Sequence, residues 1–164
     1  MSASPTAAAH PIPDIAQVKD LLGMLFDGLS VKLGPKLDVS PTASGFAGVY
    51  VSDDGAPAAL CGCDLAFAAN SGAALSMLPP NAAKDAMRDK QLTPVMLANL
   101  HEVMNICTRL MLRDDSPHLK LRELSAFSVL AAPAAAIASA PRARVDFELA
   151  IAKYGTGVLS VMCL

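Results

Sequence analysis

The C-terminal twenty residues constrain the fold more than any other part of the chain. Apolar side chains occupy alternate positions from Val145 to Ile151, and most of the positions between them are polar. Gly155-Thr156-Gly157 can turn the chain, and Val158 to Cys163 is again mostly apolar. Successive side chains of a strand point to opposite faces. We therefore expect residues 143–164 to form a β-hairpin, with one face buried and the other facing water or a partner.

Three further segments have strand patterns. Phe46 to Val51 and Ala58 to Cys63 flank the turn sequence Ser52-Asp53-Asp54-Gly55, which predicts a second hairpin. Residues 31–39 are apolar at intervals but are broken by Gly34-Pro35, so they indicate one weak strand or two short ones. Leu119, Leu121 and Leu124 mark another strand.

Four segments have helical spacing or helix caps. They are residues 14–28 with Asp14 as N-cap, about 65–77, 81–88 with Asn81 as N-cap, and 93–113 with Thr93 as N-cap and Pro94 at the first helical position. Helices and hairpins are mixed without a βαβ rhythm. The prediction is therefore an α+β fold, with helices packed on one face of a mainly antiparallel sheet. Residues 14–164 would form a single domain behind a Pro- and Ala-rich, disordered tail of residues 1–13.

Composition and charge exclude several classes of function. The net charge is −2, the pI is about 5.8, and the chain has no Trp. A basic patch and an aromatic platform for bases are therefore both missing, which argues against nucleic-acid binding. The N-terminus lacks the pattern of a secretory signal, and the apolar stretch 130–140 is too short to span a bilayer. We expect a cytoplasmic protein that does not insert into membranes.

The four cysteines are expected to be reduced and buried. Cys61 and Cys63 stand two apart on a predicted strand, so their thiols point to one face, but no CxxC pair or neighbouring His completes a metal site. Cys107 and Cys163 add no such pattern. The sequence predicts no metal ligands, and it contains no nucleotide-binding or hydrolase motif.

The helix predicted over residues 93–113 has two distinct faces. Its apolar face is predicted to consist of Met96, Leu97, Leu100, Met104, Cys107 and Met111. Glu102, Asn105 and Arg109 gather on roughly the opposite face, together with Ala98. Residues three apart are neighbours on a helix surface, so Glu102 and Asn105 should lie side by side. His101 lies at the edge of the apolar face, where packing is its expected role.

The segment Glu102-Val103-Met104-Asn105 resembles the E-x-x-N signature of the CheC/CheX/FliY chemotaxis phosphatase family. The hairpin before this helix, the small-residue helix between them and the turn at Tyr154 to Gly157 are also similar to that family. From about residue 14 onward the resemblance lies in the order of elements, and only the four-residue segment matches residue by residue. The family pattern favours Ser or Asp four residues before the Glu, where this chain has Ala98.

The resemblance implies that the chain removes phosphate from the aspartyl-phosphate of a CheY-like response regulator. Asn105 would position the attacking water, as a Gln does in GTPases, and Glu102 would anchor the partner through a Lys beside its phosphorylation site. Mg²⁺ would come from the partner, so the chain needs no cofactor of its own. We assign Arg109 and Ala98 to partner binding; the role of Arg109 is inferred from its position and is not part of the motif.

Two other functions remain open. A non-catalytic binding or assembly module of the same fold, in chemotaxis or flagellar signalling, is favoured by Ala98 and by the single copy of the motif. A small-ligand sensor with a pocket between helix and sheet is a third reading. We also expect a homodimer, since some family members dimerise and the closing strand at Leu164 is expected at a sheet edge, where unpaired backbone groups invite a partner strand.

Overall fold

The computed structural model describes residues 10–164. Most of the predicted tail, residues 1–9, therefore lies outside the described residues. The last four residues of that tail are packed, contrary to the expectation of disorder. His10 is 8% exposed, its carbonyl accepts a hydrogen bond from Arg142 Nη2 at 3.0 Å, and Ile12 packs against the core. These contacts fix the chain just before the first helix.

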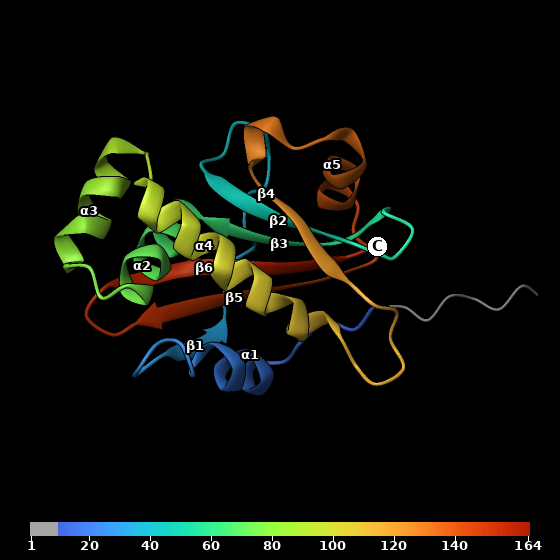
Figure 1. Cartoon of the computed structure of the whole chain (residues 1–164), viewed down its shortest axis with the longest axis horizontal. Helices are drawn as coiled ribbons and strands as arrows, with labels where there is room; N and C mark the ends of the chain where they lie inside the picture. Colours follow the sequence, from blue (N-terminus) through green and yellow to red (C-terminus); the bar gives the residue numbers. More distant parts are fainter. Residues whose placement is uncertain (1–9) are drawn as a thin grey trace, which may run out of the picture.

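The strands form one six-stranded sheet in the order β1-β5-β6-β3-β2-β4, in which every neighbouring pair is antiparallel (Figure 1). The strands are β1 (Ser30–Leu33), β2 (Gly45–Val51), β3 (Pro57–Asp64), β4 (Lys120–Ala126), β5 (Ala143–Ile151) and β6 (Gly155–Cys163). The predicted α+β class with an antiparallel sheet is confirmed. Strand β1 is shorter than the pattern suggested, because Leu37 and Val39 lie in the loop after it.

Both predicted hairpins, β2–β3 and β5–β6, are present. Gly55 in the first turn has a φ of +83°, a conformation that glycine adopts without steric cost. The two hairpins join along β3 and β6 at the centre of the sheet. The closing strand β6 is therefore central, and the expectation that it lies at an edge is wrong. A dimer built by strand addition would have to use β1 or β4, the two outer strands.

Helices α1 to α4 agree with the predicted segments except at several boundaries. The helices are α1 (Ile15–Leu22), α2 (Leu65–Leu75), α3 (Pro80–Asp89), α4 (Pro94–Ile106) and α5 (Ala132–Ser139), with the 3₁₀-helices η1 (Cys107–Met111) and η2 (Phe127–Val129). Asp14 caps α1 as predicted, but α1 stops at Leu22 because Gly23, a poor helix former, follows. Helix α3 begins one residue before Asn81, whose predicted capping role is taken by Pro79 without a side-chain bond.

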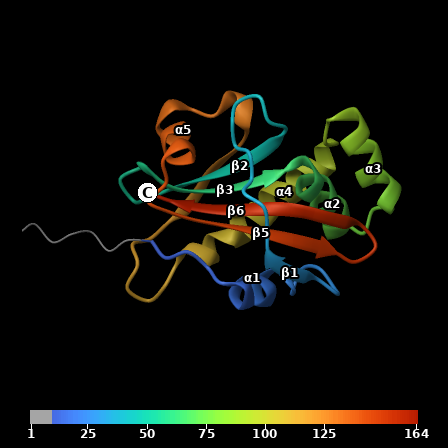
Figure 2. The ribbon, with the colours of Figure 1, turned by 180° about the vertical axis from the view of Figure 1, so that it is seen from behind.

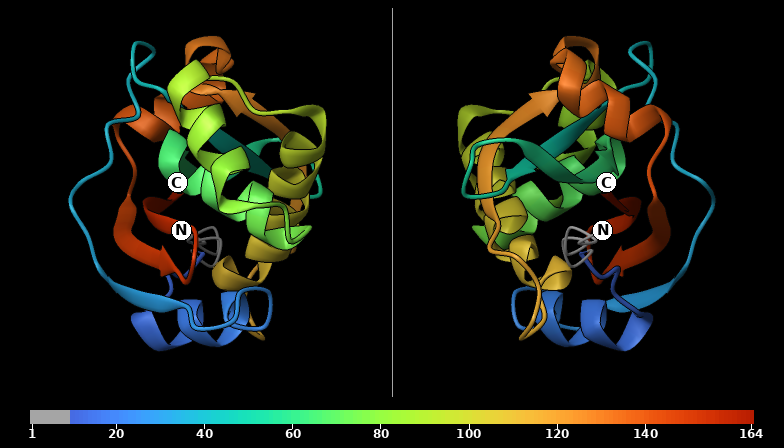
Figure 3. Two further views of the ribbon diagram at one scale, coloured as in Figure 1. Left: turned by 90° about the vertical axis from the view of Figure 1, so that its left-hand side faces the viewer. Right: turned by 90° about the vertical axis from the view of Figure 1, so that its right-hand side faces the viewer.

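Helix α5 was not predicted. Its residues are nearly all small and apolar, so they show no helical alternation of polar and apolar positions. It packs on the sheet face opposite α1 to α4 (Figures 1, 2 and 3). The main core lies between the sheet and α1 to α4, and a smaller cluster of Val49, Leu60, Ile137 and Met162 lies under α5. Within the described range, no helix is long and apolar enough to cross a membrane.

Helix α4 is fastened to α2 along its N-terminal half. Gly72 of α2 lies so close to α4 that a Cβ atom there would come within 2.8 Å of the Met96 carbonyl oxygen. Asn99 Nδ2 lies 2.8 Å from the Gly72 carbonyl oxygen and 2.7 Å from Ser76 Oγ, and it donates to both. The close approach and the two hydrogen bonds fix the position of α4 relative to its neighbour.

The other end of α4 is fastened to the sheet. The fully buried Tyr50 of β2 donates its phenolic hydrogen to the Met104 carbonyl oxygen. Gly48, two residues earlier on β2, leaves room for this contact, since a Cβ there would lie 3.4 Å from Met104 Cβ and 3.2 Å from Leu121 Cδ1. The sheet thus holds the helix backbone at the residue just before Asn105.

Tyr50→Phe should lower the free energy of unfolding by about 1–3 kcal/mol, because it leaves a buried carbonyl without its donor. Denaturant unfolding measures this loss. Tyr154→Phe is the matched control, since Tyr154 also donates to a backbone carbonyl, that of Leu78, away from α4. Amide exchange at residues 103–107 should accelerate only in Tyr50→Phe. Unchanged exchange there would contradict the anchoring role.

Stability should fall at alkaline pH. Burial raises the pKa of Tyr50 and Cys63 well above their ordinary values and that of Cys163 from 9.0 to about 11. As the pH rises, the unfolded chain therefore loses these protons before the folded chain does. The contribution of these groups to the free energy of unfolding is complete below about pH 9 and is lost as the pH rises further. Denaturant unfolding in a reducing buffer should show a flat free energy from pH 7 to 8.5 and a decline above pH 9. Cys163→Ala should reduce the decline, and a flat profile to pH 11 would contradict the account.

Candidate functional site

Helix α4 begins as the sequence predicts. Thr93 Oγ1 accepts a hydrogen bond from the Met96 backbone N–H at 3.2 Å, and Pro94 is the first helical residue. The buried face of α4 is Met96, Leu100, Val103 and Met104. Two positions differ from the predicted apolar face: Leu97 is 41% exposed and Val103 is fully buried. The reason is that α4 packs against α2 as well as the sheet, which turns its buried face away from Leu97.

Glu102 and Asn105 lie on the exposed face of α4, as does Ala98. In the described part of the chain, neither the Glu102 nor the Asn105 side chain has a hydrogen-bond partner or an ion-pair partner. The two residues are three apart on a regular α-helix, so they are surface neighbours. Their carboxylate and carboxamide are therefore free to meet a ligand or partner from solvent.

The backbone under this pair is held firmly although the side chains are free. The Met104 carbonyl accepts from Tyr50, and the Asn105 carbonyl accepts from Thr108 Oγ1 at 2.7 Å. Side chains that project from rigid elements are placed more precisely than those on loops. The arrangement combines two unpartnered polar groups with a fixed backbone, which suits recognition or catalysis.

Arg109 lies beyond the end of α4. The α-helix becomes the 3₁₀-helix η1 at Cys107, and a 3₁₀-helix turns about 120° per residue instead of about 100°. Arg109 is exposed and lines a hollow of about 370 Å³ between η1 and α1, together with Asp20, Met24 and Arg113. Arg113 Nη2 donates to Gln17 Oε1 of α1 at 2.9 Å, which ties the two elements together.

A second hollow lies toward the N-terminal end of α4. It has a volume of about 420 Å³ and is lined by Pro94, Leu97, Ala98, His101 and Leu124. The small side chain of Ala98 leaves this space open. His101 is exposed at its rim and is not packed in the core, contrary to expectation. Sequence reasoning missed this hollow because Leu97 was assigned to the buried face; only the packing of α4 on α2 reveals that it is accessible.

The thiols do not form a metal site. All four cysteines are buried and free, and no group of three potential metal-ligating side chains is found among residues 10–164. Cys61 and Cys63 both belong to the core on the α4 side of the sheet, so they share a face as predicted. Burial raises the pKa of Cys63, which keeps that thiol protonated.

Replacing Asn105 or Glu102 with Ala should change the free energy of unfolding by no more than about 0.5 kcal/mol, because neither side chain has a partner among residues 10–164 to lose. Met104→Ala, one position away but buried, should cost about 2–5 kcal/mol. Denaturant unfolding of the three variants measures this contrast. A loss of 2 kcal/mol or more in Asn105→Ala would show that the residue is structural.

Comparisons with known proteins find the fold but no sequence relative. No family model matches the chain, and no curated protein matches it. A chain of the FliM–SpeE complex from H. pylori is similar in structure with a TM-score of 0.59 at 8% identity, covering 91% of this chain and 78% of that chain. Thermotoga maritima FliY is similar with a TM-score of 0.55 at 10% identity, covering 91% of this chain and 83% of that chain.

The CheX–CheY–BeF₃–Mg²⁺ complex from Borrelia burgdorferi also matches, with 7% identity and 90% of both chains covered, but its TM-score of 0.42 is too low to carry an argument. The two better matches each cover about nine-tenths of the chain. At these identities the likeness establishes architecture alone. The chain has the α+β fold of the CheC/CheX/FliY family.

Proposed function

We propose that the exposed face of α4 docks a phosphorylated CheY-like response regulator and hydrolyses its aspartyl-phosphate. One observation carries the proposal: Glu102 and Asn105, in the E-x-x-N spacing, are solvent-exposed and unpartnered within the described residues, on a helix that Tyr50 and Asn99 hold in place. A catalytic amide must project from a firmly placed backbone, and α4 provides one.

The hydrolysis requires few groups from this chain. A water molecule attacks the phosphorus atom in line with the aspartyl oxygen, the bond from phosphorus to that oxygen breaks, and the products are inorganic phosphate and the free Asp of the partner. The Asn105 carboxamide oxygen would accept a hydrogen bond from the water and hold it in line. Glu102 would pair with a Lys beside the phosphorylation site. Mg²⁺ bound to the partner would stabilise the charge on the phosphoryl oxygens.

The two hollows beside the Glu102–Asn105 pair supply a docking surface. The apolar hollow at Leu97, Ala98 and His101 would accept an apolar side chain of the partner. Arg109 and Arg113, at the other end, would face acidic groups, which a Mg²⁺-binding phosphorylation site must contain. Ala98 would therefore contribute to partner binding because its small side chain leaves room for a side chain of the partner. Arg109 would contribute through its positive charge.

The direct test measures phosphate release from a panel of phosphorylated response regulators of the same organism. Asn105→Ala should reduce the rate on the preferred regulator to the autohydrolysis level, because the water-positioning amide is lost. Asn81→Ala removes an equally exposed Asn from α3 and is the matched control, with full activity expected. Glu102→Ala should mainly weaken partner binding, so that its rate recovers at high partner concentration. Full activity in Asn105→Ala would refute the catalytic role.

The second candidate is a non-catalytic binding or assembly module. It is favoured by Ala98, by the single motif, and by the similarity to a chain that was solved in a FliM–SpeE complex. Under this function a response regulator would bind saturably to the wild-type chain without faster loss of phosphate. Leu97→Asp, which puts a charge into the apolar hollow, should then abolish binding, whereas Asn105→Ala should not. A homodimer also remains a proposal, with β1 or β4 as its pairing edge.

A further inference from the structure

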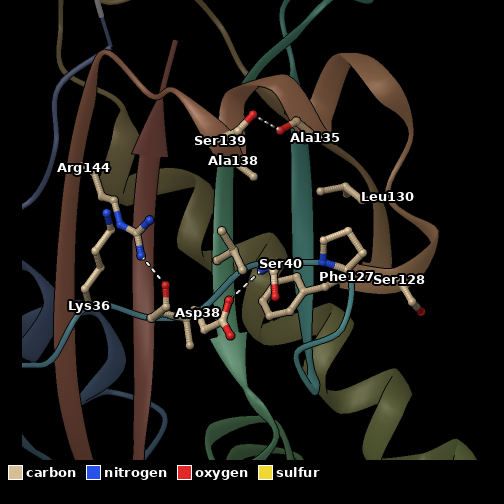
Figure 4. Close-up of a pocket in the computed structure, with 13 residues that line it drawn as sticks. Lys36, Asp38, Ser40, Phe127, Ser128, Leu130, Ala135, Ala138, Ser139 and Arg144 are labelled. Carbon is tan, nitrogen blue, oxygen red and sulfur yellow. Dashed lines mark hydrogen bonds between the residues drawn. The ribbon is translucent and has the colours of Figure 1, made fainter.

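A large hollow lies on the face of the sheet opposite α4 (Figure 4). Its volume is about 690 Å³, within the usual range for small-molecule sites. The loop of residues 34–44 forms one wall, and η2 and α5 form the other. The apolar part of the lining consists of Leu37, Val39, Pro41, Phe127, Leu130, Ala135 and Ala138. A lining of this kind favours the apolar body of a ligand.

Two cationic side chains line this hollow. Figure 4 shows Lys36 and Arg144 at the end away from Phe127. Arg144 is only 13% exposed and is held by Asp146, with Nη2 to Oδ1 at 2.9 Å and Nε to Oδ2 at 3.1 Å. Its Nη2 also donates to the Leu37 carbonyl oxygen at 2.6 Å. This guanidinium is therefore fixed in place and cannot turn away to solvent.

The fixed guanidinium of Arg144 has hydrogen-bond donors that are not in use. An arginine side chain has five N–H donors, and the bonds to Asp146 and Leu37 use those on Nε and Nη2. The two donors on Nη1 have no acceptor among the described residues. Exposed Lys36 likewise has no ion-pair partner there. An incoming anion would find both groups unengaged.

Two carboxylates lie in or beside the hollow, and hydrogen bonds hold both in place. Asp38 lines the hollow, but its Oδ1 accepts the Ser40 backbone N–H at 2.9 Å, and this bond lowers the pKa of the carboxyl group. Asp146 accepts from Arg144 and from the Leu37 backbone N–H at 3.0 Å. The pair Arg144–Asp146 thereby fixes the loop at Leu37 over the sheet. The hollow is a built site with a firm wall and not a gap under a loose loop.

We propose that this hollow binds a small amphipathic organic anion, with its acidic head at Lys36 and Arg144 Nη1 and its apolar body against Phe127 and Leu130. The head is a carboxylate or a phosphate, since both groups accept hydrogen bonds from the same N–H donors. The site lies across the sheet from Glu102 and Asn105, so it does not depend on the function proposed for α4.

Calorimetric titration of the full chain with decanoate, monodecyl phosphate and 1-decanol, all below micelle-forming concentrations, tests the proposal. Both anions should bind at one site, and decanol should bind at least tenfold more weakly. The ratio of the two anion affinities shows whether the head is a carboxylate or a phosphate. Lys36→Ala should weaken both anions about fivefold, the equivalent of about 1 kcal/mol, whereas Lys84→Ala, an exposed Lys on α3, should leave binding unchanged.

Ser139→Trp, which places an indole at the rim of the hollow, should abolish anion binding. Ala136→Trp puts the same side chain on an exposed position of α5 outside the lining and is the matched control. Amide NMR shifts on adding decanoate should cluster at residues 36–40 and 127–139 in the wild-type chain. Absence of binding by either anion, decanol binding as tightly as the anions, or equal loss in both Trp variants would overturn the proposal.

Discussion

The contact between Tyr50 and the Met104 carbonyl is the interaction on which the site depends. A helix that packs on a sheet only through apolar side chains can slide, because dispersion contacts are not directional. One buried hydrogen bond from β2 fixes both the height and the rotation of α4 at the residue before Asn105. Because Gly48 has no side chain, β2 can come close enough to α4 for this bond. The hydrogen bond from Asn99 of α4 to the Gly72 carbonyl oxygen of α2 fixes the other end of the helix. The exposed pair thus projects from a backbone that is positioned by buried groups.

Much of the fold could be predicted from local patterns. Both hairpins, the Asp14 and Thr93 caps and the segment of α2 follow from alternation and capping chemistry, which act within a few residues. The central position of β6 could not be predicted, because strand order depends on contacts between distant segments. Helix α5 was missed since an alanine-rich segment buried on one side has no polar face to reveal its period.

For the site, the sequence indicated exposed positions but not their surroundings. Glu102, Asn105 and Ala98 lie on the outer face of α4, as helical spacing predicts. The helix changes to a 3₁₀-helix at Cys107, and Arg109 beyond it lines a hollow with residues of α1; no local pattern in the sequence predicts this change. The exposure of Leu97 and His101 depends on how α2 packs against α4. The hollow at Arg144 likewise combines residues 36–41 with residues 127–144, which are far apart in the chain, so no local pattern could predict it.

The central claim is that the outer face of α4 meets an activated response regulator, and amide NMR of the labelled chain tests it directly. The chain is titrated with a regulator activated by beryllofluoride and Mg²⁺, and separately with the same regulator unactivated. The account predicts shift changes concentrated at residues 94–113, much stronger with the activated form, while residues 127–139 on the opposite face stay unchanged. Shifts confined to any other surface, or identical shifts with both forms, would contradict it.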